Sequence, residues 1–103
     1  MRTLRREFVR DHAATQGHFP QHPIVPGAFV LDDVICAISD EFQLPRQSIT
    51  VDGVKFPSPI IPGQTMTLNV EDPVARPEGR AVKFRGSVEG RQVISGSLLF
   101  AGD

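Results

Sequence analysis

Three residues between positions 17 and 38 have types and surroundings that could serve chemistry: His18, Gly27 and Asp32. A Phe-Pro pair follows His18, so a stiff loop would hold its imidazole in one place. Asp32 lies in an almost wholly apolar segment, where a carboxyl group is costly unless paired, hydrogen-bonded or protonated. The amide of Gly27, at a predicted helix start, could polarise a carbonyl oxygen as it gains enolate character. Together these residues predict a site, although Gly27 alone could simply permit the turn after Pro26.

A second carboxylate, Asp33, stands next to Asp32. At about 100° per helical residue the two side chains point in different directions, which argues against a pair that shares one proton. The alternative is structural, because a carboxylate on this segment could reach solvent or pair with an arginine. That alternative is stronger for Asp33 than for Asp32.

The three histidines, His12, His18 and His22, lie close together in the sequence. Taken singly, each is more often a surface or loop residue than a catalyst. No carboxylate or cysteine stands at helical spacing to complete a metal site with them. We therefore predict no metal centre, and His18 is the histidine whose position favours a functional role.

The segment that positions these residues begins with prolines and continues as an apolar run. Pro20, Pro23 and Pro26 make residues 18–26 extended and stiff, because each proline fixes φ and removes an N–H donor. The following A-F-V-L-D-D-V-I-C-A-I, residues 28–38, could be a helix or a long buried strand. The Pro-Gly entry, the early acidic pair and the polar exit S-D-E favour a helix. A helix apolar on every face implies a surrounding sheet or a partner chain.

The rest of the chain is typical of β-structure. We predict five strands, over residues 3–9, 48–56, 65–70, 80–88 and 92–101. Gly53 could mark a bulge, Glu89-Gly90 suits a tight hairpin turn, and residues 72–79 are predicted to be a loop. One helix with a run of antiparallel strands predicts an α+β fold. In it a curled sheet wraps around one central helix, in a single domain over residues 1–103.

Alternation along the strands assigns side chains to the core. The predicted inward residues of the third and fourth strands are Met66, Leu68, Val70, Val82 and Phe84. The second strand also alternates, with Ile49 and Val51 before Gly53 and with Val54 and Phe56 after it. The closing run L-L-F-A predicts burial on both faces of the last strand.

The composition narrows the class of function. The chain has 103 residues, 11 Lys+Arg against 12 Asp+Glu, and neither Trp nor Tyr, which argues against nucleic acid or a membrane surface as a partner. Cys36 is the only cysteine, so we predict no intrachain disulfide and a reducing, cytoplasmic setting. A chain of this size has a modest core, which favours a homodimer.

The loop and helix together resemble the (3R)-hydroxyacyl-acyl-carrier-protein dehydratases, a family with the hotdog fold. That family carries G-H-F-P-x-x-P-x-x-P-G, followed on its central helix by Glu or Asp. This chain matches the pattern with Gly17-His18-Phe19-Pro20, Pro23, Pro26-Gly27 and Asp32. A second likeness lies at V-K-F-P-S-P-I-I-P-G, residues 54–63, and the closing S-G-S-L-L-F resembles the family's last strand.

The resemblance implies a reaction and roles for named residues. His18 would be the general base that removes the α proton of a (3R)-hydroxyacyl thioester, and Asp32 of the partner subunit would protonate the departing hydroxyl. The Gly27 N–H would hydrogen-bond to the thioester carbonyl, and the product would be the trans-2-enoyl thioester. The other predicted substrate-binding residues are Phe19, Pro26, Phe29 and Phe56, of which the last two, with Val30, would line an acyl tunnel.

The resemblance also implies partners. The acyl group would arrive on the phosphopantetheine arm of an acyl carrier protein, so this chain itself would bind no cofactor. Carrier proteins are acidic, and a basic rim could dock one; the candidates are Arg2, Arg5, Arg6, Arg80 and Arg91. The predicted assembly is a homodimer that could assemble further into a trimer of dimers.

Three positions differ from the family pattern. Asp33 replaces a small residue, Cys36 replaces a glutamine thought to orient the acid and the water, and Gln64 replaces an aspartate. Two other interpretations stay open. A hotdog thioesterase would release a free carboxylic acid, and a non-catalytic subunit would pair with another dehydratase-like chain and show no activity alone.

Overall fold

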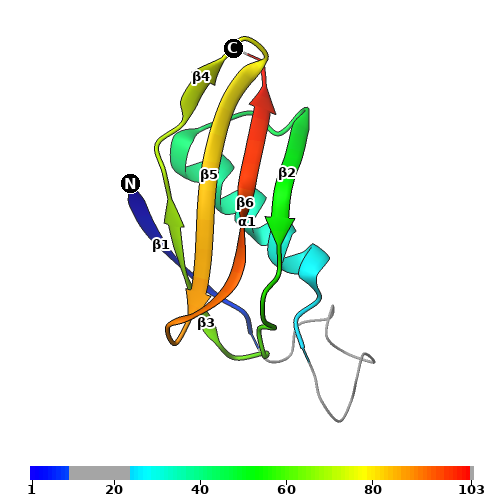
Figure 1. The fold of residues 1–103 in the computed structure, drawn as a ribbon, viewed down its shortest axis with the longest axis vertical. Helices are drawn as coiled ribbons and strands as arrows, with labels where there is room; N and C mark the ends of the chain where they lie inside the picture. The colour runs from blue at the N-terminus through cyan, green and yellow to red at the C-terminus, as the bar shows by residue number, and fades with distance from the viewer. Residues whose placement is uncertain (10–23, 103) are drawn as a thin grey trace.

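The computed structural model describes residues 1–9 and 24–102, which contain one helix and six strands (Figure 1). The helix, α1, spans Gly27–Phe42. The strands are Arg2–Glu7 (β1), Ile49–Lys55 (β2), Thr65–Val70 (β3), Val74–Arg76 (β4), Gly79–Val88 (β5) and Arg91–Ala101 (β6).

The strands form one antiparallel sheet in the order β1-β3-β5-β6-β2, with β4 paired to the start of β5. The long β5 and β6 lie at the centre, and β1 and β2 lie at the two edges. The sheet is curled, and α1 lies across one of its faces, behind β5 and β6 in the view of Figure 1. The predicted α+β arrangement of one sheet and one helix is confirmed.

The core lies between α1 and the inner face of the sheet. From the sheet come the predicted residues, all of them buried: Met66, Leu68, Val70, Val82 and Phe84. From α1 come Val30, Val34, Ala37 and Ile38. Their positions follow the helical period, so they form one stripe along α1. The described residues leave the opposite side of α1 open, because the sheet covers only one side of the helix.

α1 continues four residues beyond the predicted end at residue 38. The polar S-D-E run predicted an exit, but Ser39 is buried and its hydroxyl donates to the carbonyl of Leu44. The helix stops at Gln43, which adopts a left-handed conformation and donates its N–H to the Ser39 carbonyl. Within the described residues, no helix has both the length and the apolarity needed to cross a membrane.

One strand lies where a loop was predicted. β4 falls within residues 72–79, and all three of its residues are exposed. An exposed strand shows no hydrophobic alternation, and the flanking Pro73 and Pro77 favoured a loop. Pairing with β5 decides its conformation, with Val74 opposite Ala81.

The edge strand β2 departs from the predicted inward alternation. The bulge predicted at Gly53 is confirmed, since the register with β6 shifts between Asp52 and Lys55 and Gly53 has a φ of 60°. Val51 in β2 and Phe56 directly after it are 42% and 46% exposed, and within the described part of the chain no strand pairs with the outer side of β2. The edge therefore presents apolar side chains to its surroundings.

The hairpin between β5 and β6 has the predicted turn. Glu89 and Gly90 both have positive φ, at 52° and 78°, as a tight type I′ connection requires. In β6, Leu98 and Phe100 are buried, whereas Leu99 is half-buried on the outer face. The inner face of the last strand is thus buried as predicted, whereas its outer face is only partly buried.

Phe100→Ala is expected to lower the free energy of unfolding by about 3–5 kcal/mol, since it removes a fully buried ring and leaves a cavity. Leu99→Ala, one position along the same strand, is the matched control and should cost clearly less. Chemical denaturation of both variants measures the difference. Equal losses would contradict the assignment of Phe100 to the core and Leu99 to the outer face.

Candidate active site

The N-terminus of α1 presents a free backbone amide at Gly27. Pro26 caps the helix, and its carbonyl accepts hydrogen bonds from the N–H groups of Phe29 and Val30, at 3.0 and 3.1 Å. Among the described residues, none accepts a hydrogen bond from the Gly27 N–H. The first amides of a helix point outward at its positive end, where they can bind an oxygen that carries negative charge.

An open, mainly apolar cleft of about 270 Å³ lies beside Gly27. Its lining is Ile24, Val25, Gly27, Val30, Phe56, Pro57, Ser58, Pro59, Ile60 and Val93. The ring of Phe56 packs so closely on Gly27 that an added Cβ would lie 3.3 Å from it. The position suits glycine because of this close approach, in addition to any role in the turn.

The wall of the cleft formed by residues 57–60 is tied to the β5–β6 hairpin. The Ser58 hydroxyl donates to the Gln92 carbonyl at 2.6 Å, and Arg91 Nη1 donates to the Pro59 carbonyl at 2.8 Å. The Val25 N–H donates to the Ile60 carbonyl at 2.8 Å, which joins this wall to the start of α1. The cleft is therefore held by polar contacts on two sides.

Gln64 has a local structural role at the end of this wall. Its side-chain oxygen Oε1 accepts a hydrogen bond from the Ile61 N–H at 2.8 Å. A carboxylate at this position could accept the same bond, so the difference from the family's aspartate is chemically conservative.

Asp32 is exposed on α1 and points away from the cleft of its own chain. It lies two residues after Val30, which lines the cleft, and two residues correspond to a rotation of about 200° around a helix. Its neighbours one turn away are Ala28, which is exposed, and Cys36, which is half-buried. The burial expected for this carboxyl group is therefore not provided by the described part of a single chain.

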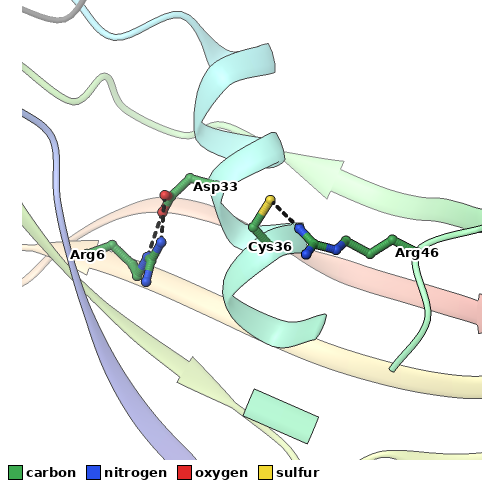
Figure 2. Close-up of polar contacts among 4 residues, drawn as sticks. All are labelled: Arg6, Asp33, Cys36 and Arg46. Carbon is green, nitrogen blue, oxygen red and sulfur yellow. Dashed lines mark hydrogen bonds and ion pairs between the residues drawn. The ribbon is translucent and has the colours of Figure 1, made fainter. Parts of the chain in front are cut away.

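Asp33 pairs with an arginine, as the structural alternative predicted. Arg6 Nε and Nη2 each donate to a different carboxylate oxygen of Asp33, both at 2.9 Å (Figure 2). The hydrogen bond to Asp33 raises the pKa of Arg6 above its ordinary value. Arg6 comes from β1, at one edge of the sheet, so this pair connects the sheet edge to the helix.

Cys36 is contacted by a second arginine that follows the helix. Arg46 Nη1 donates to the Cys36 sulfur at 2.9 Å (Figure 2), and Arg46 Nη2 lies 3.6 Å from a carboxylate oxygen of Asp40. Cys36 stands at the position of the family's glutamine. The guanidinium group of Arg46 thus places N–H donors near the position where the family's glutamine would place its amide, one turn from Asp32.

Comparison of the sequence with known families identifies the chain. A sequence model of ApeI-like proteins, described as ApeI dehydratase, matches residues 2–97. The chain belongs to this dehydratase family. The resemblance to hydroxyacyl-acyl-carrier-protein dehydratases noted from the motif is thereby confirmed.

Individual relatives of the chain are also dehydratases. The chain is 35% identical over 94 residues to a 3-hydroxyacyl-[acyl-carrier-protein] dehydratase FabZ of Myxococcus xanthus, covering 81% of this chain and 60% of the relative. It is 37% identical over 98 residues to the FabZ of Roseiflexus castenholzii, covering 84% of this chain and 65% of the relative. The chain thus spans less than two thirds of the length of these two relatives.

Among solved structures, the dehydratase heterocomplex ApeI:P from Xenorhabdus doucetiae contains a chain with a similar fold. The TM-score is 0.76 at 20% identity, over 97% of this chain and 86% of that one. The similarity supports the hotdog fold predicted for this ApeI-like chain.

Several of the residues predicted for the ApeI-like site lie outside the described residues. These are His18 and Phe19, together with His12 and His22, so their roles stay predictions. Within residues 1–9 and 24–102 no group of three or more His, Cys, Asp or Glu could hold a metal ion.

Of the predicted substrate-binding residues within the described part, Gly27 and Phe56 lie together at the cleft, and Val30 joins them. Pro26 caps the helix and is not among the lining residues. Phe29 is not among them either, because its ring packs edge-on against Phe8, with 6.5 Å between ring centroids. The structure therefore brings the amide and one side of the predicted tunnel together.

Three of the five arginines predicted to form a basic rim are engaged within the chain. Arg2 and Arg6 pair with carboxylates of α1, and Arg91 donates to a carbonyl of the cleft wall. Arg5 and Arg80 are exposed and have no ion pair among the described residues. The contacts of Arg46, in the loop after α1, and of Arg91, at the start of β6, were missed because no spacing rule in the sequence connects an arginine to the thiol or carbonyl of another element.

Proposed function

We propose that this ApeI-like chain dehydrates a (3R)-hydroxyacyl thioester carried on an acyl carrier protein, giving the trans-2-enoyl thioester and water. The active form is a dimer of two such chains in the cytoplasm, which could assemble further into a trimer of dimers. Each site takes His18, Gly27 and the cleft from one chain and Asp32 from its partner. The family supports the reaction type, and the geometry around Gly27 and Asp32 supports the division between two chains.

The chemistry proceeds by proton transfer. The His18 imidazole removes the α proton, and the thioester carbonyl oxygen gains negative charge that the Gly27 N–H stabilises. The carboxyl group of the partner's Asp32 then protonates the β-hydroxyl, which leaves as water while the double bond forms. Proton transfer from imidazolium to carboxylate, directly or through water, restores both groups for the next turnover.

The position of Asp32 on the open side of α1 is the observation that carries the two-chain site. Its carboxylate is exposed, and the apolar Leu31 and Ile35 beside it are also left partly uncovered. A second chain that covers this side would enclose the carboxyl group and bring it to the cleft of that chain, where it could act as the proton donor. The exposed Val51 on the edge strand, and Phe56 directly after that strand, add apolar surface for the same contact.

Turnover of hydroxyacyl groups of several chain lengths on acyl carrier protein, followed as enoyl product by mass spectrometry, tests the proposal. Wild-type protein should form the enoyl thioester, and absence of product at every chain length would contradict the proposed reaction. Release of a free carboxylic acid would favour a thioesterase instead.

Mixing two inactive variants tests the division of the site. In a hybrid dimer of His18→Ala and Asp32→Asn chains, one of the two sites keeps both functional groups. A random mixture should therefore recover about a quarter of the wild-type activity, as expected for a two-fold symmetric dimer. If both groups came from the same chain, the mixture would stay inactive.

A heterodimer is a second candidate, in which this chain is a subunit that pairs with another dehydratase-like chain. A structurally similar chain comes from the dehydratase heterocomplex ApeI:P, and Cys36 replaces the glutamine of the family pattern. Native mass spectrometry of the purified chain distinguishes the candidates. A monomer without activity, which gains activity when a dehydratase-like partner is added, would favour the heterodimer.

A further inference from the structure

The edge strand β1 and the helix α1 meet in a matched repeat. The residues Arg2, Arg6 and Phe8 face α1 and contact Glu41, Asp33 and Phe29, in that order. Along residues 2–8 the three positions are four and then two residues apart, and their partners along α1 are eight and then four residues apart. Two residues of a strand span about 6.7 Å and four residues of a helix about 6 Å, so each step along residues 2–8 matches a step of similar length along α1. The three contacts, two from β1 and one from Phe8 directly after it, therefore lie along one side of α1.

The Arg6–Asp33 pair is the most directional of these contacts. Both ends are two-pronged, because two guanidinium nitrogens meet two carboxylate oxygens at 2.9 Å. The side chains are 35% and 23% exposed, so the pair is partly shielded from water. A planar fork of this kind restricts the direction of approach as well as the distance. It therefore limits rotation of α1 about its own axis.

Asp32 directly precedes Asp33, so its direction follows from the rotation of the helix. With Asp33 held towards β1, Asp32 is turned by about 100° to the open side of α1. Arg6 also compensates the charge of Asp33, which would otherwise be an unpaired carboxylate beside the proposed acid.

We propose that Arg6 and Asp33 are a positioning pair, which sets the rotation of α1 and thereby aims Asp32 into the site of the partner chain. The proposal rests on the proposed function, and it assigns a role to the carboxylate that replaces a small residue of the family pattern. Neither residue touches the substrate; both act through Asp32.

The double variant Arg6→Ala/Asp33→Ala tests the pair without leaving an unpaired charge. It should lower kcat about 10- to 100-fold through misplacement of the acid, while KM stays within about twofold, since the cleft is unchanged. The exchanged pair, Arg6→Asp/Asp33→Arg, should recover part of kcat by restoring the link. A pair that only stabilises the fold would lower the melting temperature and leave kcat unchanged.

The matched control is Glu41→Gln, which breaks the Arg2–Glu41 pair and leaves Arg2 in place. This pair joins the same strand to the same helix, with 2.6 Å between Arg2 Nη1 and a Glu41 carboxylate oxygen, but lies nine residues from Asp32. This variant should keep the wild-type kcat. Equal kcat in wild type and Arg6→Ala/Asp33→Ala, or an equal loss of kcat in Glu41→Gln, would overturn the proposal.

Amide hydrogen exchange gives a readout that does not depend on turnover. In Arg6→Ala/Asp33→Ala, the amides of residues 31–36 should exchange about fivefold faster than in wild type, as expected for the loss of one local constraint. In the control variant the faster exchange should lie near the C-terminus of α1. Inactive wild-type protein would contradict the proposed function. Unchanged amide exchange at residues 31–36 in Arg6→Ala/Asp33→Ala would contradict the role of the positioning pair.

Discussion

Asp32→Asn is expected to lower kcat for dehydration about 10²- to 10⁴-fold, the range for loss of a general acid. An amide has nearly the size of a carboxyl group but cannot deliver its proton to the departing hydroxyl. The fold should be unaffected, because Asp32 is exposed and none of the described residues forms a hydrogen bond or ion pair with it. Initial rates of enoyl thioester formation, measured beside thermal unfolding, check both parts of this expectation.

Asp40→Asn is the control for Asp32→Asn. Asp40 is also an exposed aspartate of α1, two turns further along, so its substitution removes the same charge from the same helix. It should keep most of the activity. If Asp32→Asn retained more than about a tenth of wild-type turnover, the acid would have to be another group.

Gly27→Pro is expected to lower kcat about 10²- to 10³-fold, the usual cost of losing one donor to a developing oxyanion. Proline removes the N–H that the proposed mechanism places on the thioester carbonyl. The backbone can accept it, because Gly27 is the first residue of α1, a position that suits proline. Pro26 before it has a ψ of 141°, the extended conformation that a residue before proline prefers.

Gly27→Ala separates the lost amide from the added bulk. Both variants carry a Cβ 3.3 Å from the Phe56 ring, which must move by a few tenths of an ångström. Only the alanine variant keeps the N–H, so its kcat should stay within about tenfold of wild type. Similar kinetics for the proline and alanine variants would show that the amide at this position is not needed for turnover.

Short-range signals in the sequence predicted most of the fold. Alternating apolar residues located β3 and its inward side chains, and Glu89-Gly90 located the β5–β6 turn, because both depend on neighbouring residues only. β4 was missed because an exposed strand has no such alternation. The end of α1 was misplaced because a contact between Ser39 and Leu44, beyond the predicted end, satisfies a polar group that otherwise signals an exit.

The sequence by itself determined the family, and it predicted the reaction type and the three residues on which the proposed mechanism depends: His18, Gly27 and Asp32. Their types and spacing form one continuous motif, and a motif can be read without knowing what lies beside it. The role of Asp33 was left open between solvent and an arginine, since the sequence around it contains no partner.

Only the tertiary structure decided the contacts between distant segments. It placed Arg6 against Asp33, 27 residues away, and Arg46 against Cys36, because the sheet edge and the loop after α1 pack beside the helix. It also placed Gly27 at the cleft and turned Asp32 to the opposite side of α1. These relations depend on contacts between distant segments, namely the core packing against one side of α1 and the Arg6–Asp33 pair, rather than on local spacing.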